Sequence, residues 1–187
     1  MKDTEYSIKD FIKDALAILS DAEDEQTLLN RIQPLAIRAA AHPDLIQPSM
    51  YEADEVLGFG STLLHEEADL SLFVVVDSWL PGRGVRPHDH GTWAVVVGLD
   101  GTEHNAFWRR LDEGEREGYA QLEKTGEAAI SEGESIMMKS GEIHSVENRS
   151  HQATLSFHVY GRHLNHTGRS QFDIENGREI PFIIETR

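Results

Sequence analysis

Three histidines have the spacing of a metal site. His88 and His90 are separated by one residue in RPHDHGTW, and a β-strand places residues two apart on the same face, as a chelating pair requires. Pro87 cannot donate to a sheet ladder and suits a strand start. His144 follows a glycine turn in SGEIHSVEN and belongs to another strand-like run. These histidines are candidate ligands of one metal ion, although a chain with ten histidines also contains such a pair by chance.

A second constellation lies in TLSFHVYG, where Ser156, His158 and Tyr160 alternate. All three would face the same side of one strand. The histidine can hold the tyrosine hydroxyl by a hydrogen bond, and the hydroxyl can bond to oxygen or to a substrate as charge develops. The simpler interpretation is a polar network between core strands.

A helical N-terminal part precedes the elements that carry these residues. From residue 1 to about 50, apolar residues recur at three- and four-residue steps, which predicts two amphipathic helices. The second is expected from roughly Glu23 to Ala41, with Pro34 shifting its start or bending it. His42-Pro43 should end it, because a residue before proline avoids helical angles.

From about residue 55, short runs rich in Val, Ile, Phe and Trp alternate with glycine turns. Many short strands at this spacing predict a β-sandwich or barrel and not a parallel α/β sheet. Asp100-Gly101 lies between two such runs and predicts a hairpin, and a last hairpin should turn near Asn176-Gly177. The expected strands include SLFVVVDSW, TWAVVVGL, TEHNAFWRRL, AAISEGESIMM, IHSVEN and ATLSFHVYG.

The composition limits the classes of function. The chain has 187 residues, which suits one compact domain, and its 17 basic and 33 acidic residues give a net charge of −16. Such a surface repels nucleic-acid phosphates and anionic lipids, so neither nucleic acid nor membrane is an expected partner. The absence of cysteine excludes disulfides, thiolate metal sites and a cysteine nucleophile. No secretory signal or membrane span is recognisable, and we expect a cytoplasmic protein.

The intervals around the histidines resemble the two signature motifs of the cupin superfamily. The chain departs from them at Ala94, where many cupins carry a glutamate ligand, and at Lys139, where a proline is usual. The resemblance implies a mainly β fold: a cupin double-stranded β-helix, or jelly-roll barrel, over residues 51–187, with the helical segment 1–50 packed on it in one structural domain. The matching intervals run through Gly82, His88, His90, Ala94 and Gly101, and then through Gly133, Lys139, Gly141, His144 and Asn148.

Among cupins, a site of three histidines is similar to that of the thiol dioxygenases, the cysteine dioxygenase and 3-mercaptopropionate dioxygenase family. Those enzymes use non-haem Fe(II) to add both atoms of O2 to a substrate sulfur, which gives a sulfinate. They also carry a Ser–His–Tyr row beside the iron, which Ser156, His158 and Tyr160 resemble. Three neutral imidazoles leave a divalent metal its full charge and open positions, which favours a thiolate and dioxygen.

The resemblance also bears on the choice of thiol. Cysteine dioxygenases of the mammalian type carry a carboxylate-binding arginine where this chain has Thr62, and a cysteine near Ala94 that crosslinks to the tyrosine. The mercaptopropionate type instead has an arginine about nine residues beyond the tyrosine, where Arg169 lies. A guanidinium can clamp a carboxylate through two hydrogen bonds. The alternatives are that Arg169 is a solvated loop charge or that Arg162 takes this role.

We therefore expect an Fe(II) enzyme whose partners are O2 and a small mercapto-carboxylate, with 3-mercaptopropionate the leading candidate. Cysteine dioxygenase activity, another metal-dependent cupin activity such as an isomerase or a carbon-centred dioxygenase, and a non-enzymatic ligand-binding cupin remain alternatives. Exposed strand edges leave a homodimer open.

Overall fold

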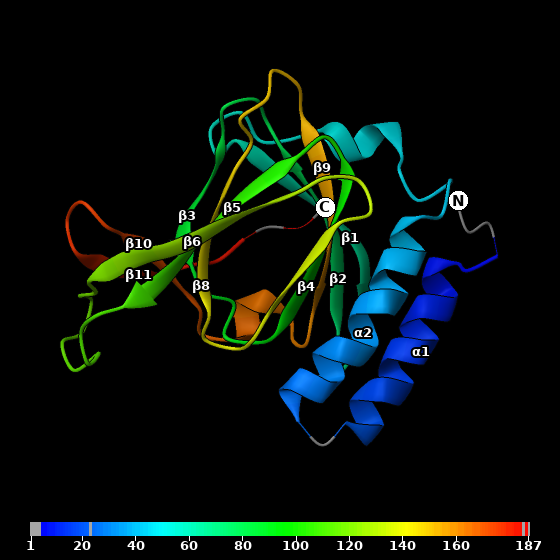
Figure 1. Cartoon of the computed structure of the whole chain (residues 1–187), viewed down its shortest axis with the longest axis horizontal. Coiled ribbons are helices and arrows are strands. Elements are labelled where there is room, and N and C mark those ends of the chain that lie inside the picture. Colours follow the sequence, from blue (N-terminus) through cyan, green and yellow to red (C-terminus); the bar gives the residue numbers. More distant parts are fainter. Residues whose placement is uncertain (1–4, 23, 185, 187) are drawn as a thin grey trace.

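Two helices cover one side of a two-sheet β-barrel in the computed structural model of this protein (Figure 1). The structure describes residues 5–22, 24–184 and 186. Residues 1–4 and Glu23, which the predicted helical segment includes, lie outside the described residues, as do residues 185 and 187 of the predicted barrel. No helix in the described part of the chain is long and apolar enough to cross a membrane.

The first helix, α1 (Ile8–Asp21), begins where a capping box satisfies its free amides. The Asp10 backbone N–H donates to Ser7 Oγ at 3.3 Å, and the Ser7 N–H donates to the Asp10 carboxylate at 3.0 Å. The second, α2 (Glu25–Ala40), is continuous through Pro34 and ends before His42-Pro43, as predicted. Helices therefore form over most of the segment where the apolar periodicity predicted them.

Eleven strands follow within the described residues, in two antiparallel sheets. One sheet has the order β1-β2-β9-β4-β7 and the other β11-β10-β3-β8-β5-β6. The strands are β1 (Phe59–Glu66), β2 (Phe73–Trp79), β3 (Gly84–His88), β4 (Ala94–Asp100), β5 (Glu103–Arg110), β6 (Leu122–Ile130), β7 (Ser135–Met138), β8 (Ile143–Glu147), β9 (Thr154–Tyr160), β10 (Ser170–Asp173) and β11 (Arg178–Pro181). Short 3₁₀ helices lie at Pro48–Tyr51 and Leu164–His166.

The strand order is that of a jelly roll, because strands distant in sequence become neighbours. β9 lies between β2 and β4, and β8 lies between β3 and β5 in the facing sheet. The mainly β class, with helices preceding a barrel of this type, is therefore confirmed. The last hairpin is also confirmed, since β10 and β11 pair with Asp173 opposite Arg178.

The strand β9 separates the helices from the barrel interior. Leu155, Phe157 and Val159 belong to the apolar cluster that includes α1 and α2, and Phe157 meets Phe11 edge-on with ring centroids 5.7 Å apart. The alternating residues of β9 face the other way, into the barrel. Both faces of this sheet are covered, which explains why every residue of β2 and β9 is buried.

The hairpin predicted at Asp100-Gly101 is wrong. The turn exists, and Gly101 has the positive φ of 72° that such a turn requires, but it connects β4 in one sheet to β5 in the other. Both edges of β4 are already paired, with β9 and β7, so β5 has no place beside it. The strand β1 (Phe59–Glu66) was not among the predicted runs, because its face pattern is mixed.

Candidate metal centre

The three predicted ligands come together inside the barrel. One ligand atom from each of His88, His90 and His144 lies within 4.8 Å of the others, and all three side chains are buried. His88 ends β3 and stands opposite His144 of β8 in the register of that sheet. Nε2 of His90 lies 3.2 Å from Nε2 of His144. No carboxylate joins this cluster among the described residues.

The route by which His90 reaches the cluster differs from the prediction. β3 ends at His88, so Pro87 lies near the end of the strand and His90 belongs to the loop after it. Gly91 turns the chain there with a φ of 61°, and a Cβ atom on it would come within 2.8 Å of Thr167. A loop, and not the pleat of a single strand, therefore brings the second imidazole to the first.

Hydrogen bonds determine which ring nitrogen of His88 and of His144 carries the hydrogen and which one has the lone pair. The Nδ1–H of His144 donates to Asn105 Oδ1 at 2.7 Å, and Nδ1 of His88 lies 2.9 Å from the Arg86 carbonyl oxygen, to which it donates. In a neutral imidazole this leaves Nε2 as the lone-pair nitrogen. Nδ1 of His90 is buried and has no partner in the protein.

Burial keeps these rings in the form that binds metal. Burial lowers the pKa of His144 to about 4, despite the opposing effect of Glu103. It also lowers the pKa of His88 and His90 well below the ordinary value, and the neighbouring imidazoles add to this effect. Neutral rings whose Nε2 atoms lie 3.2 Å apart fit a shared divalent cation with bonds of about 2.1 Å. The residues present therefore fit a metal ion.

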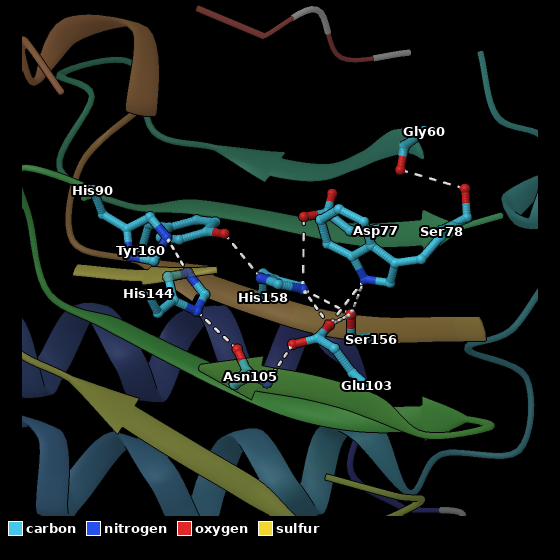
Figure 2. Close-up of polar contacts among 11 residues, drawn as sticks. Gly60, Asp77, Ser78, His90, Glu103, Asn105, His144, Ser156, His158 and Tyr160 are labelled. Atoms are coloured by element: carbon cyan, nitrogen blue, oxygen red, sulfur yellow. Dashed lines mark hydrogen bonds and ion pairs between the residues drawn. The ribbon is translucent and has the colours of Figure 1, made fainter. Parts of the chain in front are cut away.

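The predicted row on β9 lies next to this cluster (Figure 2). Ser156 Oγ is 2.8 Å from His158 Nε2, and His158 Nδ1 is 2.8 Å from the Tyr160 hydroxyl. The Tyr160 ring meets the His90 ring edge-on, with centroids 5.0 Å apart. All three members of the row are buried. The alternation on one strand was therefore the correct basis for grouping them.

Two buried carboxylates beside the row were not predicted from the sequence. Glu103 Oε2 accepts hydrogen bonds from Ser156 Oγ at 2.5 Å and from Trp79 Nε1 at 2.9 Å. Asp77 Oδ2 lies 3.6 Å from His158 Nε2 on the other side. The available signal was a polar residue inside an apolar run in FVVVDSW, and polar residues two apart in TEHNAFW, which share a strand face.

These carboxylates set the protonation of the row. Burial lowers the pKa of His158, but Asp77 and Glu103 outweigh it and raise that pKa above its ordinary value. Burial alone would raise the pKa of Glu103, yet His158, Ser156 and Asn105 lower it to about 2, so Glu103 is ionised at neutral pH. Burial and the charge of Asp77 raise the pKa of Tyr160 well above 10, which keeps its hydroxyl protonated.

Arg169 is a buried residue and not a solvated loop charge. It is 4% exposed; its Nε donates to the Phe182 carbonyl at 3.1 Å and its guanidinium lies 4.0 Å from the centre of the Phe182 ring. Nη2 is buried without a partner, and burial lowers the Arg169 pKa to about 10. Arg162, the alternative, is exposed.

Arg169 borders two cavities. The inner one, of about 20 Å³, is lined by His88, His144, His158, Tyr160 and Arg169, and its lining also includes Phe182 and Ile184. The outer one, of about 570 Å³, shares Arg169 and Phe182 with it. Five of the predicted site residues therefore line one small interior space, and Phe182 borders both this space and the larger groove.

Ala94 occupies the position where the sequence departs from the cupin pattern. It is buried on β4 and stands opposite Tyr160 of β9. A methyl group at this position leaves the three imidazoles as the only His, Asp or Glu ligand set found among the described residues.

No protein-family model matches the chain, and no curated protein matches it either. In shape it is similar to an oxalate oxidase in complex with glycolate, with a TM-score of 0.46 and 17% identity over 63% of this chain and 59% of that one. It is also similar to an uncharacterised Klebsiella pneumoniae protein with a double-stranded β-helix domain, with a TM-score of 0.49 and 14% identity over 69% of this chain and 91% of that one. A cupin domain of an XRE-family regulator from Enterobacter cloacae gives a TM-score of 0.41 and 13% identity over 57% of this chain and 98% of that one. These likenesses concern the fold alone.

Proposed function

We propose that this protein is a non-haem Fe(II) thiol dioxygenase that acts on a small mercapto-carboxylate, with 3-mercaptopropionate the first candidate. The observation that carries the proposal is a buried set of three neutral imidazoles without a carboxylate among the described residues. Two of them, His88 and His144, line a small cavity together with Tyr160 and with Arg169, whose Nη2 has no partner. The reaction converts one thiol and one O2 into one sulfinate and, at neutral pH, one proton.

The charge of the site favours an anionic sulfur. Three neutral ligands leave a divalent ion its full positive charge and open coordination positions. Bound Fe(II) would supply the electrons that activate O2 and would hold the substrate thiolate. The surrounding protein contributes a water-poor interior, since His88, His90 and His144 are at most 5% exposed. In such an interior an electrostatic interaction is stronger than in water.

Tyr160 supplies a hydrogen bond to the oxygen side of this reaction. The raised pKa of His158 favours its imidazolium form, in which Nδ1–H donates to the Tyr160 oxygen. The Tyr160 hydrogen then remains available to a group in the cavity. Because the pKa of Tyr160 is raised as well, this hydroxyl acts as a donor and does not ionise near neutral pH.

Arg169 binds the carboxylate of the substrate in this proposal. Its Nη2 has no partner and its Nε bonds only to a backbone carbonyl, so a carboxylate offers a better acceptor to both. The inner cavity of about 20 Å³ has room for roughly one water molecule. A mercapto-acid therefore requires Phe182 and Ile184 to shift, which connects the site to the outer groove.

Oxygen consumption by the Fe(II)-reconstituted protein tests the proposal. We expect uptake with 3-mercaptopropionate exceeding that with cysteine or mercaptosuccinate, and one sulfinate formed for each O2. A His144→Ala variant should lose metal and activity, whereas a variant of the exposed His151, His151→Ala, should keep both. Iron-loaded protein that binds the thiols but consumes no O2 would contradict the proposal and indicate a binding protein.

A further inference from the structure

We propose that Glu103 is a positioning residue whose carboxylate fixes the direction of hydrogen bonds toward His144 and toward His158. This inference rests on the proposed metal site, but it does not depend on which reaction the metal performs. The hydrogen bonds of Glu103 go to Trp79, Asn105 and Ser156 and not to the three histidines of the cluster. Its role follows from the groups that converge on it and from what each of them contacts next (Figure 2).

Three donors surround the Glu103 carboxylate. Oε2 accepts from Trp79 Nε1 at 2.9 Å and from Ser156 Oγ at 2.5 Å, and Oε1 accepts from Asn105 Nδ2 at 2.9 Å. Glu103 is 2% exposed, so water does not compete for these positions. An ionised carboxylate can only accept, and each neighbour must therefore turn a hydrogen toward it.

The arm through Asn105 determines the tautomer of His144. Because Asn105 turns its amide nitrogen to Glu103, its carbonyl oxygen faces the other way and accepts the Nδ1–H of His144 at 2.7 Å. The lone pair of His144 is then on Nε2, the nitrogen that faces His90. A metal needs that lone pair. The Glu103 carboxylate, which is two hydrogen bonds away from His144 through Asn105, therefore keeps the lone pair on the nitrogen that can bind the metal.

The arm through Ser156 determines the direction of the hydrogen bond between Ser156 and His158. The Ser156 hydroxyl has one hydrogen, which it donates to Glu103, so its oxygen must accept from His158 Nε2–H at 2.8 Å. His158 then meets the Tyr160 hydroxyl through Nδ1. A continuous chain of hydrogen bonds thus runs from the Tyr160 hydroxyl to the His144 ring, and Glu103 is the one acceptor-only group within it.

The variant Glu103→Gln reverses the hydrogen bonds that run through Asn105 to His144 and keeps those from Trp79 and Ser156. Two donors meet at Oε2, so the glutamine oxygen takes that position and its amide nitrogen faces Asn105. Asn105 must then turn its oxygen to Gln and its amide nitrogen to His144 Nδ1, which moves the His144 hydrogen to Nε2. We expect the affinity for Zn(II), measured by competition with a chromophoric chelator, to fall about 10–100-fold.

The exchange variant Glu103→Gln/Asn105→Asp restores an acceptor opposite His144 Nδ1, while the bond between positions 103 and 105 runs in the opposite direction from that in the wild type. The glutamine amide donates to Asp at position 105, and that carboxylate accepts the Nδ1–H of His144. The net charge is unchanged. We expect the affinity for Zn(II) to return to within a few-fold of the wild-type value or to exceed it, which a loss of packing at Glu103→Gln would not explain.

Asp77→Asn is the matched control, because it removes a buried carboxylate 3.6 Å from His158 without contacting Asn105. It should weaken Zn(II) binding much less than Glu103→Gln. An equal loss in both variants would overturn the proposal in favour of a simple charge effect. So would a Glu103→Gln variant with wild-type affinity, or a folded exchange variant that stays weak.

A measurement on the unmodified protein keeps the test decisive even where a variant does not fold. The imidazole ¹⁵N spectrum of the metal-free wild type should show His144 with its hydrogen on Nδ1. A hydrogen on Nε2 would overturn the proposal. Failure of O2 consumption would refute the dioxygenase but leave these affinities and this tautomer unaffected, so the two hypotheses fail separately.

Discussion

At the scale of single residues, the buried guanidinium of Arg169 lowers the stability of the folded protein. The guanidinium of Arg169 is 4% exposed and its Nη2 has no partner. Leaving a buried donor unsatisfied costs about 1–3 kcal/mol. Functional groups are commonly held in such unfavourable positions, because a substrate then supplies the missing interaction.

We therefore expect Arg169→Met to stabilise the substrate-free protein by about 1 kcal/mol. The thermal midpoint should rise, while the KM for a mercapto-carboxylate should increase strongly because the carboxylate loses its partner. Calorimetry and steady-state kinetics measure the two effects. Arg162→Met, a change at an exposed arginine, should alter neither quantity. An Arg169→Met variant with an unchanged KM would remove Arg169 from the site.

The sequence predicted the residues of the site better than the partners that orient them. His88, His90, Ser156, His158 and Tyr160 were found from local spacing. Their partners are long-range: Glu103 contacts Ser156 over 53 positions, and Asn105 contacts His144 over 39. No period of two or of 3.6 residues carries information across such a distance, because only the sheet register brings these residues together.

At the scale of elements, the helix pair and the metal centre occupy opposite faces of one sheet. Phe11 of α1 packs on Phe157 of β9, while the neighbouring Ser156 and His158 face the interior. Phe11→Ala removes a fully buried ring and should lower the free energy of unfolding by about 3–5 kcal/mol. Urea denaturation measures this loss.

The affinity of the folded Phe11→Ala variant for Zn(II) should stay close to the wild-type value, because the sheet lies between the cavity left by Phe11 and the histidines. A large loss of metal affinity would mean that the helices also shape the site. The helices themselves were predictable from apolar periodicity, and the end of α2 was predictable from Pro43. Strand pairing was not, since Asp100-Gly101 marks a turn but not the sheet that the next strand joins.

At the scale of the whole molecule, the buried histidines make folding sensitive to acid. The pKa of His144 is about 4 in the folded protein against an ordinary value of 6.5, and those of His88 and His90 are lowered as well. The unfolded chain therefore binds protons below about pH 6.5 that the folded chain does not. Stability is greatest above that pH and falls as the pH decreases toward 4.

Between about pH 6.5 and pH 4, each of these histidines makes the free energy of unfolding fall by about 1.4 kcal/mol for each pH unit of acidification. Urea unfolding of the metal-free protein at pH 7.5, 6.5 and 5.5 should show the decline, and Zn(II) should reduce it because metal competes with protons for the same nitrogens. Equal stability at pH 7.5 and pH 5.5 without metal would contradict the neutral, buried state of the three rings.

The late position of β9 in the chain has a consequence for synthesis. β2 and β4 leave the ribosome first, yet each needs β9 as its neighbour, and β9 ends only at Tyr160. At a translation rate of about 5–20 residues per second, the valine-rich strands β2 and β4 remain for seconds without the strand that pairs with both of them. Unpaired edges of this kind attract other chains. Nascent polypeptides that stall before residue 160 should therefore depend on holdase chaperones, whereas full-length ones should not.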